Sequence, residues 1–453
     1  MQPIQPQDQQ ERAQTYAKNH EMLLGLFYKG AHRSASDADR SVRMRLERFL
    51  VDRSTQSLVP FEGQVGIEAM LNQLASQWPG CTLQHYDGHL MGIAVRLLVR
   101  GNVVPVIISL GAGGQIVCSV GPADSVVTLR ESIDDFDRQL HLASLALGCD
   151  YVLVAEGYNP YANSPLDVQL IPRARFTLLS AYLAQTGRYA RDALRCTCAT
   201  QVLLRMGNDR ESLDAFQLAT ALHPILSFLT DNVRSFRGSG ARRCPRMVRS
   251  IIWDEVDPAR CGLVPDTFER GFTFERYLTW AESLQPILLT DDSGTVTSTG
   301  KRSMADVMGD SALSAREGRW LLEAVHPPVR LGANVELLQA DALLPAQAAA
   351  YAAFVKGLLG TPLSLDQTRD LLGPISEADV REATESLRKN GWDAQVFGRP
   401  VADIVDGLLH IARTCLTDAE ERELLEQVAP LWDFHMVPRD AFVQQETKAS
   451  RGW

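Results

Sequence analysis

The order of apolar and polar residues predicts a chain that mixes strands with helices. Charged and apolar side chains alternate from Val42 to Asp52, a pattern typical of a strand with one buried face. Residues 66–78 instead carry apolar side chains at helical spacing, and residues 132–148 form a helical pattern that ends at Gly148. The β-branched segment 89–122, interrupted by glycine and proline, indicates successive strands joined by turns.

The rest of the chain continues this mixture without a regular alternation of strand and helix. Further strands are predicted near residues 151–158, 195–205, 247–253 and 334–341. Further helices are predicted near residues 174–187, 210–230, 346–359, 376–389 and 418–429. Residues 291–301, rich in Asp, Ser, Gly and Thr, are expected to form a surface loop. This arrangement favours an α+β fold with a mainly antiparallel sheet over a doubly wound fold.

Composition narrows the classes of protein that fit. Of the 453 residues, 45% are hydrophobic and 22% charged, which is average for a folded globular protein and argues against disorder. The net charge of −10 argues against a general nucleic-acid binder or a protein of anionic membrane surfaces. No apolar run approaches the length of a membrane span, and the N-terminus lacks a signal-like apolar stretch. Eight cysteines without a CxxC pair are expected to be reduced and structural, so we expect a cytoplasmic protein.

Common nucleotide and hydrolase motifs do not explain the sequence. The stretch GAGGQ (111–115) lacks the full GxGxxG pattern and is not followed by a predicted helix, so we interpret it as a glycine bend beside a strand. The sequence contains no GxSxG, HExxH or Walker motif.

Six segments in register carry a more specific signal. They are RLERFLVD (45–52), SLGAGGQ (109–115), PRARF (172–176), TQV (200–202), RSIIWDEVDPARCG (249–262) and VELLQADALLP (335–345). Because it carries these six segments in this order, the chain resembles the glutamate–cysteine ligases, in particular the plant and actinobacterial type, from about residue 20 to 360. The resemblance implies a sheet that forms a funnel flanked by helices, as in glutamine synthetase and glutamate–cysteine ligase.

The resemblance also implies a reaction and its cofactors. Such ligases use ATP and Mg²⁺ to phosphorylate the γ-carboxylate of glutamate, and the amine of cysteine then displaces phosphate. Family members hold magnesium with glutamates at alternate positions of several strands, so that each pair points into the funnel. The implied partners are therefore small molecules, namely glutamate, an amine such as cysteine, and ATP, with a homo-oligomer or a heteromer with an active ligase as a further expectation.

This sequence keeps only part of the family's residues. By resemblance, Glu47 and Glu336 are the candidate metal ligands. The candidate substrate- or nucleotide-binding residues are Gln115, Arg173, Arg175, Gln201 and Trp253. The candidate catalytic residues are Arg249 and Arg260, with Arg249 as the expected partner of the glutamate carboxylate, because a guanidinium binds a carboxylate bidentately.

The departures fall on the positions that should hold metal. Arg45, Gly111 and Val117 stand where acids are expected, Arg205 stands where the family pattern leads to an aspartate, and Leu338 replaces an arginine. A guanidinium about 5 Å from a divalent cation costs roughly 6–7 kcal/mol at an effective dielectric near 20. The alternative is that Arg45 and Arg205 pair with Glu47 and Glu336 and convert the metal site into ion pairs.

Three hypotheses follow from the sequence. The first is an ATP-dependent ligase that forms γ-glutamylcysteine, with its activity impaired or altered. The second is a ligase-dead paralogue that acts as a binding or regulatory partner. The third is a ligase with altered substrates, in which Arg45 and Arg205 bind an extra carboxylate or phosphate. In each case we expect a polar extension (1–20), a ligase-like domain (21–360) and a helical region packed on it (361–453).

Overall fold

The computed structural model describes residues 6–31 and 40–450 and is built around one large antiparallel sheet. Its spatial order is β11-β12-β8-β1-β6-β5-β4-β3, and β2 and β7 pair with the far end of β1. The strands are β1 (Ser41–Asp52), β2 (Ser57–Leu58), β3 (Thr82–Tyr86), β4 (His89–Val99), β5 (Asn102–Leu110), β6 (Ile116–Ala123), β7 (Tyr151–Val154), β8 (Ala199–Arg205), β11 (Val329–Leu331) and β12 (Val335–Asp341). Every pairing in this sheet is antiparallel, so the α+β prediction is confirmed.

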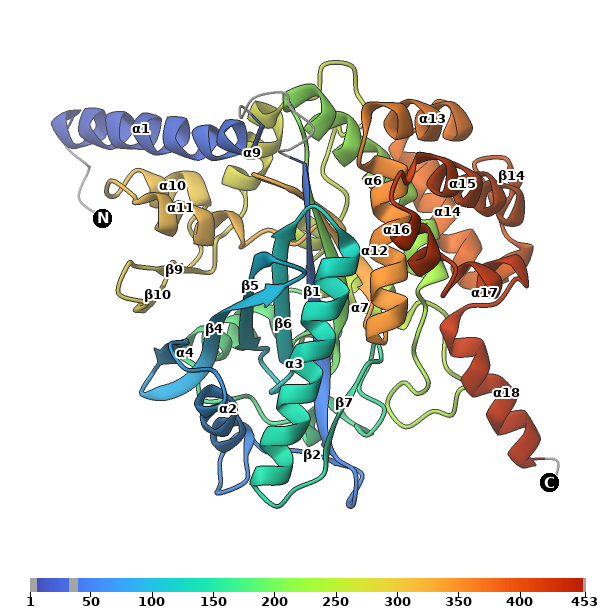
Figure 1. Cartoon of the computed structure of the whole chain (residues 1–453). Coiled ribbons are helices and arrows are strands. Elements are labelled where there is room, and N and C mark those ends of the chain that lie inside the picture. Colours follow the sequence, from blue (N-terminus) through green and yellow to red (C-terminus); the bar gives the residue numbers. More distant parts are fainter. Residues whose placement is uncertain (1–5, 32–39, 451–453) are drawn as a thin grey trace.

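Strand β1 lies in the centre of the sheet, and its alternating sequence gives it two different faces (Figure 1). Val42, Met44 and Leu46 are buried on one face. Arg45 lies opposite Gln201 of β8, and Glu47 lies opposite Val117 of β6, on the other face. The predicted strand at 42–52 is therefore confirmed, and its charged residues share one face as the period of two requires.

Three helices cover the apolar face of the sheet. They are α2 (Ile67–Ser76), α3 (Val126–Ala146) and α12 (Pro345–Leu359). The alanine-rich α12 is buried along most of its length and packs on α3, which lies beside it in Figure 1. Helix α3 starts where the Ser125 side chain accepts a hydrogen bond from the Val127 N–H, several residues before the predicted start at 132.

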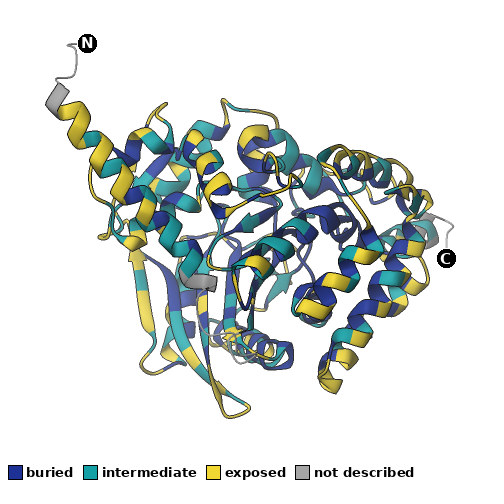
Figure 2. Cartoon of the chain, turned by 90° about the horizontal axis from the view of Figure 1, so that it is seen from above, coloured by how far each residue is buried: buried dark blue, intermediate teal, exposed yellow. Residues whose placement is uncertain are grey.

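The opposite, polar face of the sheet is walled in by shorter elements. These are α4 (Ala174–Leu183), α5 (Ala190–Cys196), α7 (Val248–Val256), α8 (Pro258–Cys261), β9 (Leu288–Thr290), β10 (Val296–Ser298) and α11 (Ala315–Leu322). With the sheet they enclose the funnel that the resemblance implied. Helices α1 (Pro6–Ala31), α9 (Phe274–Ser283) and α10 (Met304–Met308) pack together beside α11. Figure 2 shows that the first half of α1 is largely exposed.

A helical region flanks the sheet on the side of α6 (Asp209–Leu229) and α12 (Figure 1). It contains α13 (Pro362–Leu372), α14 (Glu377–Asn390), α15 (Val401–Cys415), α16 (Ala419–Leu425), α17 (Ala429–Asp433) and α18 (Pro438–Ser450), with the small hairpin β13 (Gln395–Val396) and β14 (Arg399–Pro400). Two single 3₁₀ turns lie at Pro165–Asp167 and Gly391–Asp393. Among the described helices none is by itself long and apolar enough to cross a membrane, although the bent pair α12–α13 passes on length and composition.

Three local predictions differ from the structure. The strand predicted at 247–253 is wrong, because these residues form α7. Its β-branched residues suggested a strand, but Val248, Ile252 and Val256 recur at helical spacing and are buried together, and a short apolar run cannot distinguish the two. The predicted loop at 291–301 contains β10 of a β9–β10 hairpin, and the first part of the predicted strand 195–205 is the end of α5. The predicted division into an extension (1–20), a ligase-like domain (21–360) and a helical region (361–453) stays a prediction, and residue 20 lies within α1.

Candidate functional site

The candidate site is the funnel between the polar face of the sheet and the short elements opposite it. Two adjoining cavities make up the funnel and share the side chains of Arg45, Gln201, Glu323 and Arg330. The inner cavity, about 1610 Å³, is lined by β1, α4, α7 and α8, and the outer cavity, about 1720 Å³, by β1, β8, β11 and β12. Both volumes are large enough for a nucleotide or an amino acid.

The funnel walls are strongly basic although the whole chain is acidic. Nine arginines and three glutamates line the two cavities. The arginines are Arg43, Arg45, Arg173, Arg175, Arg205, Arg249, Arg260, Arg319 and Arg330, and the glutamates are Glu47, Glu323 and Glu336. A cleft with one sign of charge concentrates ligands of the opposite sign, so the geometry suits anions.

Glu47 lies in the inner cavity and is held by its neighbours. Its Oε1 lies 3.3 Å from Nη2 of Arg45 and 3.4 Å from Nε2 of Gln201, and its Oε2 accepts a hydrogen bond from the backbone N–H of Ala199 at 3.2 Å. The ion pair between Arg45 and Glu47 is the one considered as an alternative from the sequence.

Glu336 lies in the outer cavity and is paired with an arginine that the sequence did not single out. Both Nε and Nη2 of Arg330, on the adjacent strand β11, donate to Oε2 of Glu336, with the Nε contact at 2.8 Å. The expected pairing with Arg205 is therefore not what the structure contains. Arg330 faces Glu336 directly across the β11–β12 ladder.

The two candidate metal ligands cannot share one ion. Glu336 lies opposite Leu203 of β8, and Leu203 in turn lies opposite Arg43 of β1. Glu47 is four residues farther along β1, a separation of about 13 Å along the strand. Magnesium ligands lie about 2.1 Å from the ion, so each glutamate would have to bind metal alone and beside a guanidinium.

No cluster of three or more His, Cys, Asp or Glu that could hold a metal occurs in the described residues. The residues present do not fit magnesium.

Three positions that depart from the family pattern, Gly111, Val117 and Leu338, carry no side-chain oxygen. A Cβ atom at Gly111 would lie 2.5 Å from Oε1 of Gln115, so a glutamate there would have to displace that amide. Val117 and Leu338 are buried. These positions are now part of the packed wall and supply no ligand oxygen.

Arg249 and Trp253 lie one helical turn apart on α7, at the base of the funnel. Arg249 is buried, and its Nη1 donates to the backbone oxygen of Gln339 at 3.1 Å. Its guanidinium lies 5.9 Å from the centre of the Trp253 ring. That ring packs on the imidazole of His326, with 4.2 Å between the two ring centres. Burial lowers the pKa of His326 well below its usual value, and nearby arginines including Arg330 lower it further, so this imidazole is neutral.

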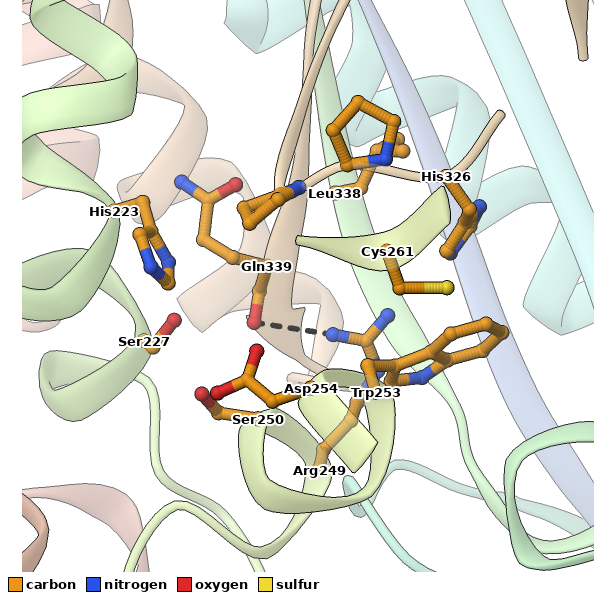
Figure 3. Close-up of a pocket in the computed structure, with 12 residues that line it drawn as sticks. His223, Ser227, Arg249, Ser250, Trp253, Asp254, Cys261, His326, Leu338 and Gln339 are labelled. Carbon is orange, nitrogen blue, oxygen red and sulfur yellow. Dashed lines mark hydrogen bonds between the residues drawn. The ribbon is translucent and has the colours of Figure 1, made fainter. Parts of the chain in front are cut away.

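A smaller pocket behind Arg249 contains an unusual group of unpaired polar atoms (Figure 3). Nε of Arg249, Nε1 of Trp253, Nδ1 of His223, Oγ of Ser227 and both amide atoms of Gln339 are buried and have no hydrogen-bond partner among the described residues. Arg249 and Trp253 line this pocket and the inner cavity alike. Buried polar groups are normally satisfied, so the base of the funnel has hydrogen-bonding capacity for water or a ligand.

Arg173 and Arg175, at the start of α4, face the inner cavity. The guanidinium of Arg173 lies 4.1 Å from the centre of the Tyr86 ring, and Nη2 of Arg175 lies 3.9 Å from Oε2 of Glu323. Burial lowers the pKa of both arginines, and neighbouring arginines lower each further. Both cations are therefore poorly compensated within the protein.

Gln115 and Arg260 line the inner cavity, but their polar atoms are already bonded to the protein. Oε1 of Gln115 accepts from the Gly113 N–H at 2.8 Å, and its Nε2 donates to Leu194 and Thr197 oxygens, each at 3.2 Å. Nε of Arg260 donates to Asp257 at 3.0 Å, and its other nitrogens donate to the backbone oxygens of Ala324 and Gln285 and to the Tyr182 hydroxyl. The hydrogen bonds of Gln115 and Arg260 thus connect separate segments of the chain that line the inner cavity.

The structure thus places all nine predicted site residues around the funnel, eight in the inner cavity and Glu336 in the outer one. The sequence reasoning missed Arg43, Arg319, Arg330, Glu323 and His326. Arg43 could have been found, since it lies two residues before Arg45 and so on the same strand face. The others come from residues 319–330, where no motif distinguishes a funnel residue from a surface residue.

Comparisons with known proteins agree with this architecture. The sequence model of the glutamate–cysteine ligase family 2 matches residues 45–431. Glutamate–cysteine ligase B from Oryza sativa subsp. japonica is 23% identical over 354 residues, which cover 76% of this chain and 70% of that protein. The Arabidopsis thaliana ligase is 26% identical over 321 residues, covering 69% of this chain and 59% of that protein.

A solved structure supports the fold independently. The glutamate–cysteine ligase of Francisella tularensis, solved in complex with AMP, superimposes with a TM-score of 0.55 at 11% identity, covering 90% of this chain and 84% of that one. At this identity the similarity speaks for the fold. With the family match over most of its length, this chain belongs to glutamate–cysteine ligase family 2.

Proposed function

We propose that this protein is an ATP-dependent carboxylate–amine ligase that binds an acidic amino acid such as glutamate at the base of the funnel. The amine partner is cysteine or a similar amine. Family membership supports the reaction class, and the AMP bound to the Francisella tularensis relative supports nucleotide binding. The single observation that carries the proposal is the placement of Arg249 and Trp253 at the base of an open, basic cavity.

Arg249 is suited to hold the substrate carboxylate. One of its nitrogens is bonded to Gln339, whereas its Nε has no partner among the described residues. Its pKa is lowered by burial, although Asp341 and Glu47 oppose that effect, so an incoming carboxylate gains from pairing with it. The Trp253 ring lies beside the Arg249 guanidinium and forms part of the base of the inner cavity.

The reaction needs positive charge where phosphate charge develops. The γ-phosphoryl group passes from ATP to the substrate carboxylate and leaves ADP. The amine then attacks the acyl phosphate, a C–N bond forms, and phosphate departs with the C–O bond electrons while the amine loses a proton. Arg173 and Arg175 face the same cavity as Arg249 and are suited to stabilise the transferred phosphoryl group.

One observation favours a second candidate, a ligase-dead protein that only binds its ligands. Glu47, Glu323 and Glu336 each lie within ion-pair distance of an arginine, so no funnel carboxylate is left to hold a metal. Binding of substrate and nucleotide without turnover would be the expected behaviour of such a protein.

The test is ADP release from ATP in the presence of glutamate, with cysteine added or omitted. Under the proposal, cysteine stimulates release, and Arg249→Gln lowers the rate by about a hundredfold because a buried charged hydrogen bond is lost. Arg188→Gln is the matched control, since Arg188 is 73% exposed and lines neither cavity. Bound ATP without cysteine-stimulated release would instead select the ligase-dead candidate.

A further inference from the structure

We propose that the outer cavity is a metal-independent binding site for the oligophosphate chain of a nucleotide, in which guanidinium groups occupy the role of metal ions. The site consists of Arg43, Arg205, Arg319 and Arg330, which we call the rim cluster. The identity of the ligand as a nucleotide rests on the proposed function. The absence of a metal requirement rests on the charges of this cavity.

The charges lining the outer cavity do not balance. Five arginines face two glutamates, because Arg45 joins the rim cluster. Glu336 is engaged by Arg330, and Glu323 lies 3.9 Å from Arg175 of the inner cavity. Within residues 6–31 and 40–450, no carboxylate lies within ion-pair distance of Arg43, Arg205 or Arg319.

The rim cluster is built on adjacent elements, so its charges converge. Arg43 lies opposite Leu203 of β8, two residues from Arg205 on the same strand face. Arg330 reaches the row from β11, and Arg319 projects from the last turn of α11. Like charges that are diagonal neighbours in a sheet repel each other, so this arrangement costs folding energy unless an anion lies between them.

The electrostatics of Arg43 agree with that geometry. Burial lowers its pKa, and Arg205 lowers it further, whereas Glu336 opposes both effects. The guanidinium is therefore less well compensated than an arginine in water.

An oligophosphate fits this cavity better than a single carboxylate. Several guanidiniums spread over three strands and a helix match a ligand with several oxyanions in a row. The guanidiniums of Arg43, Arg205 and Arg319, which have no ion-pair partner among the described residues, can each bind one phosphate bidentately. The outer cavity adjoins the inner one through Arg45, Gln201, Glu323 and Arg330. A phosphate chain in the outer cavity can therefore meet a carboxylate held by Arg249 in the inner one.

The same residues explain why metal is dispensable. Glu47 and Glu336 are about 13 Å apart along the strand direction, and each is paired with an arginine. In this chain Glu336 is a negatively charged side chain inside the proposed phosphate site, and its role is to fix the position of the Arg330 guanidinium. Removing its charge should strengthen phosphate binding, whereas removing a metal ligand would weaken it.

The test is calorimetric titration of the full chain with ATP and with inorganic tripolyphosphate, first in EDTA and then in excess Mg²⁺. We expect ATP to bind in EDTA as tightly as in Mg²⁺ or more tightly, and tripolyphosphate to compete with it. Arg205→Gln should weaken ATP binding about tenfold, and Glu336→Gln should strengthen it several-fold. Arg381→Gln, on α14 and outside both cavities, is the matched control and should change nothing.

A second design reverses the metal preference. Arg45→Glu puts another carboxylate beside Glu47 on the same strand face, and we expect ATP binding by this variant to become stronger with Mg²⁺ than with EDTA. Circular dichroism of each variant checks that it is folded.

The proposal is wrong if the wild type binds ATP only with Mg²⁺, if tripolyphosphate fails to compete with ATP, or if folded Glu336→Gln binds ATP more weakly than the wild type. Absence of any ATP binding would overturn it as well. Absence of ADP release with metal-free binding intact would instead refute the proposed ligase activity and leave the site standing.

Discussion

The two faces of β1 use arginine in opposite ways. On the apolar face, Arg48 is 1% exposed and makes a bidentate ion pair with Asp137 of α3, with nitrogen–oxygen distances of 2.6 and 2.5 Å. On the funnel face, Arg43 has no such partner among the described residues, and the Arg45 side chain, paired at 3.3 Å with Glu47, is 41% exposed.

The arginine on the apolar face of β1 stabilises the fold, whereas the arginines on its funnel face are available to bind a ligand. A buried charge is tolerated only when a partner of opposite charge satisfies it, and Asp137 does so for Arg48. Half-exposed arginines can remain under-compensated because water screens them. The guanidiniums on the funnel face can therefore bind an anionic ligand, whereas the guanidinium of Arg48 on the other face is already paired within the protein.

The largest expected effect comes from breaking the pair on the apolar face. Asp137→Ala leaves Arg48 buried without a partner and should lower the free energy of unfolding by about 3–5 kcal/mol. Urea denaturation followed by circular dichroism measures this change. A loss below about 1 kcal/mol would mean that water replaces Asp137 and that the two faces do not differ as described.

A second prediction concerns a buried carboxyl whose arginine compensates it only in part. Burial raises the pKa of Glu156 from 4.5 to about 7, although Arg234 opposes the shift with an ion pair at 2.9 Å. The folded protein thus holds a proton that the unfolded chain releases. The stability due to this group is complete below about pH 4.5 and is lost as the pH rises to about 7.

Glu156→Gln should remove that loss. The variant should exceed the wild type in free energy of unfolding by on the order of 2 kcal/mol at about pH 8, and the difference should shrink towards about pH 5. Urea melts at a series of pH values measure it. A difference that is constant with pH would show that Arg234 compensates Glu156 fully.

The smallest expected effect comes from the funnel face. Arg43→Gln should change the free energy of unfolding by less than about 0.5 kcal/mol, because the side chain lines the open outer cavity and has no ion-pair partner among the described residues. The same urea melts used for Asp137→Ala provide the comparison. Destabilisation of more than about 1 kcal/mol would give Arg43 a structural role like that of Arg48.

Local sequence patterns predicted the sheet better than the helix that carries Arg249. Alternation in β1 was clear because one face is buried and the other wet, so the period of two survives in the sequence. The segment around Arg249 and Trp253 was predicted as a strand, since Ile251 and Ile252 favour strands and seven residues do not separate the two periods. Both periods place residues 249 and 253 on one side, so their joint role in the site could still be predicted.

The sequence by itself determined the family, the central strand and the excess of arginine over acid at the expected metal positions. These features are local, because each depends on residue type and on spacing within one segment. Only the tertiary structure decided which charges meet. It paired Glu336 with Arg330 rather than Arg205, separated Glu47 from Glu336, and engaged Gln115 and Arg260 in the walls. Ion pairs form between segments far apart in the chain, and strand order and register, which no single segment specifies, set their distances.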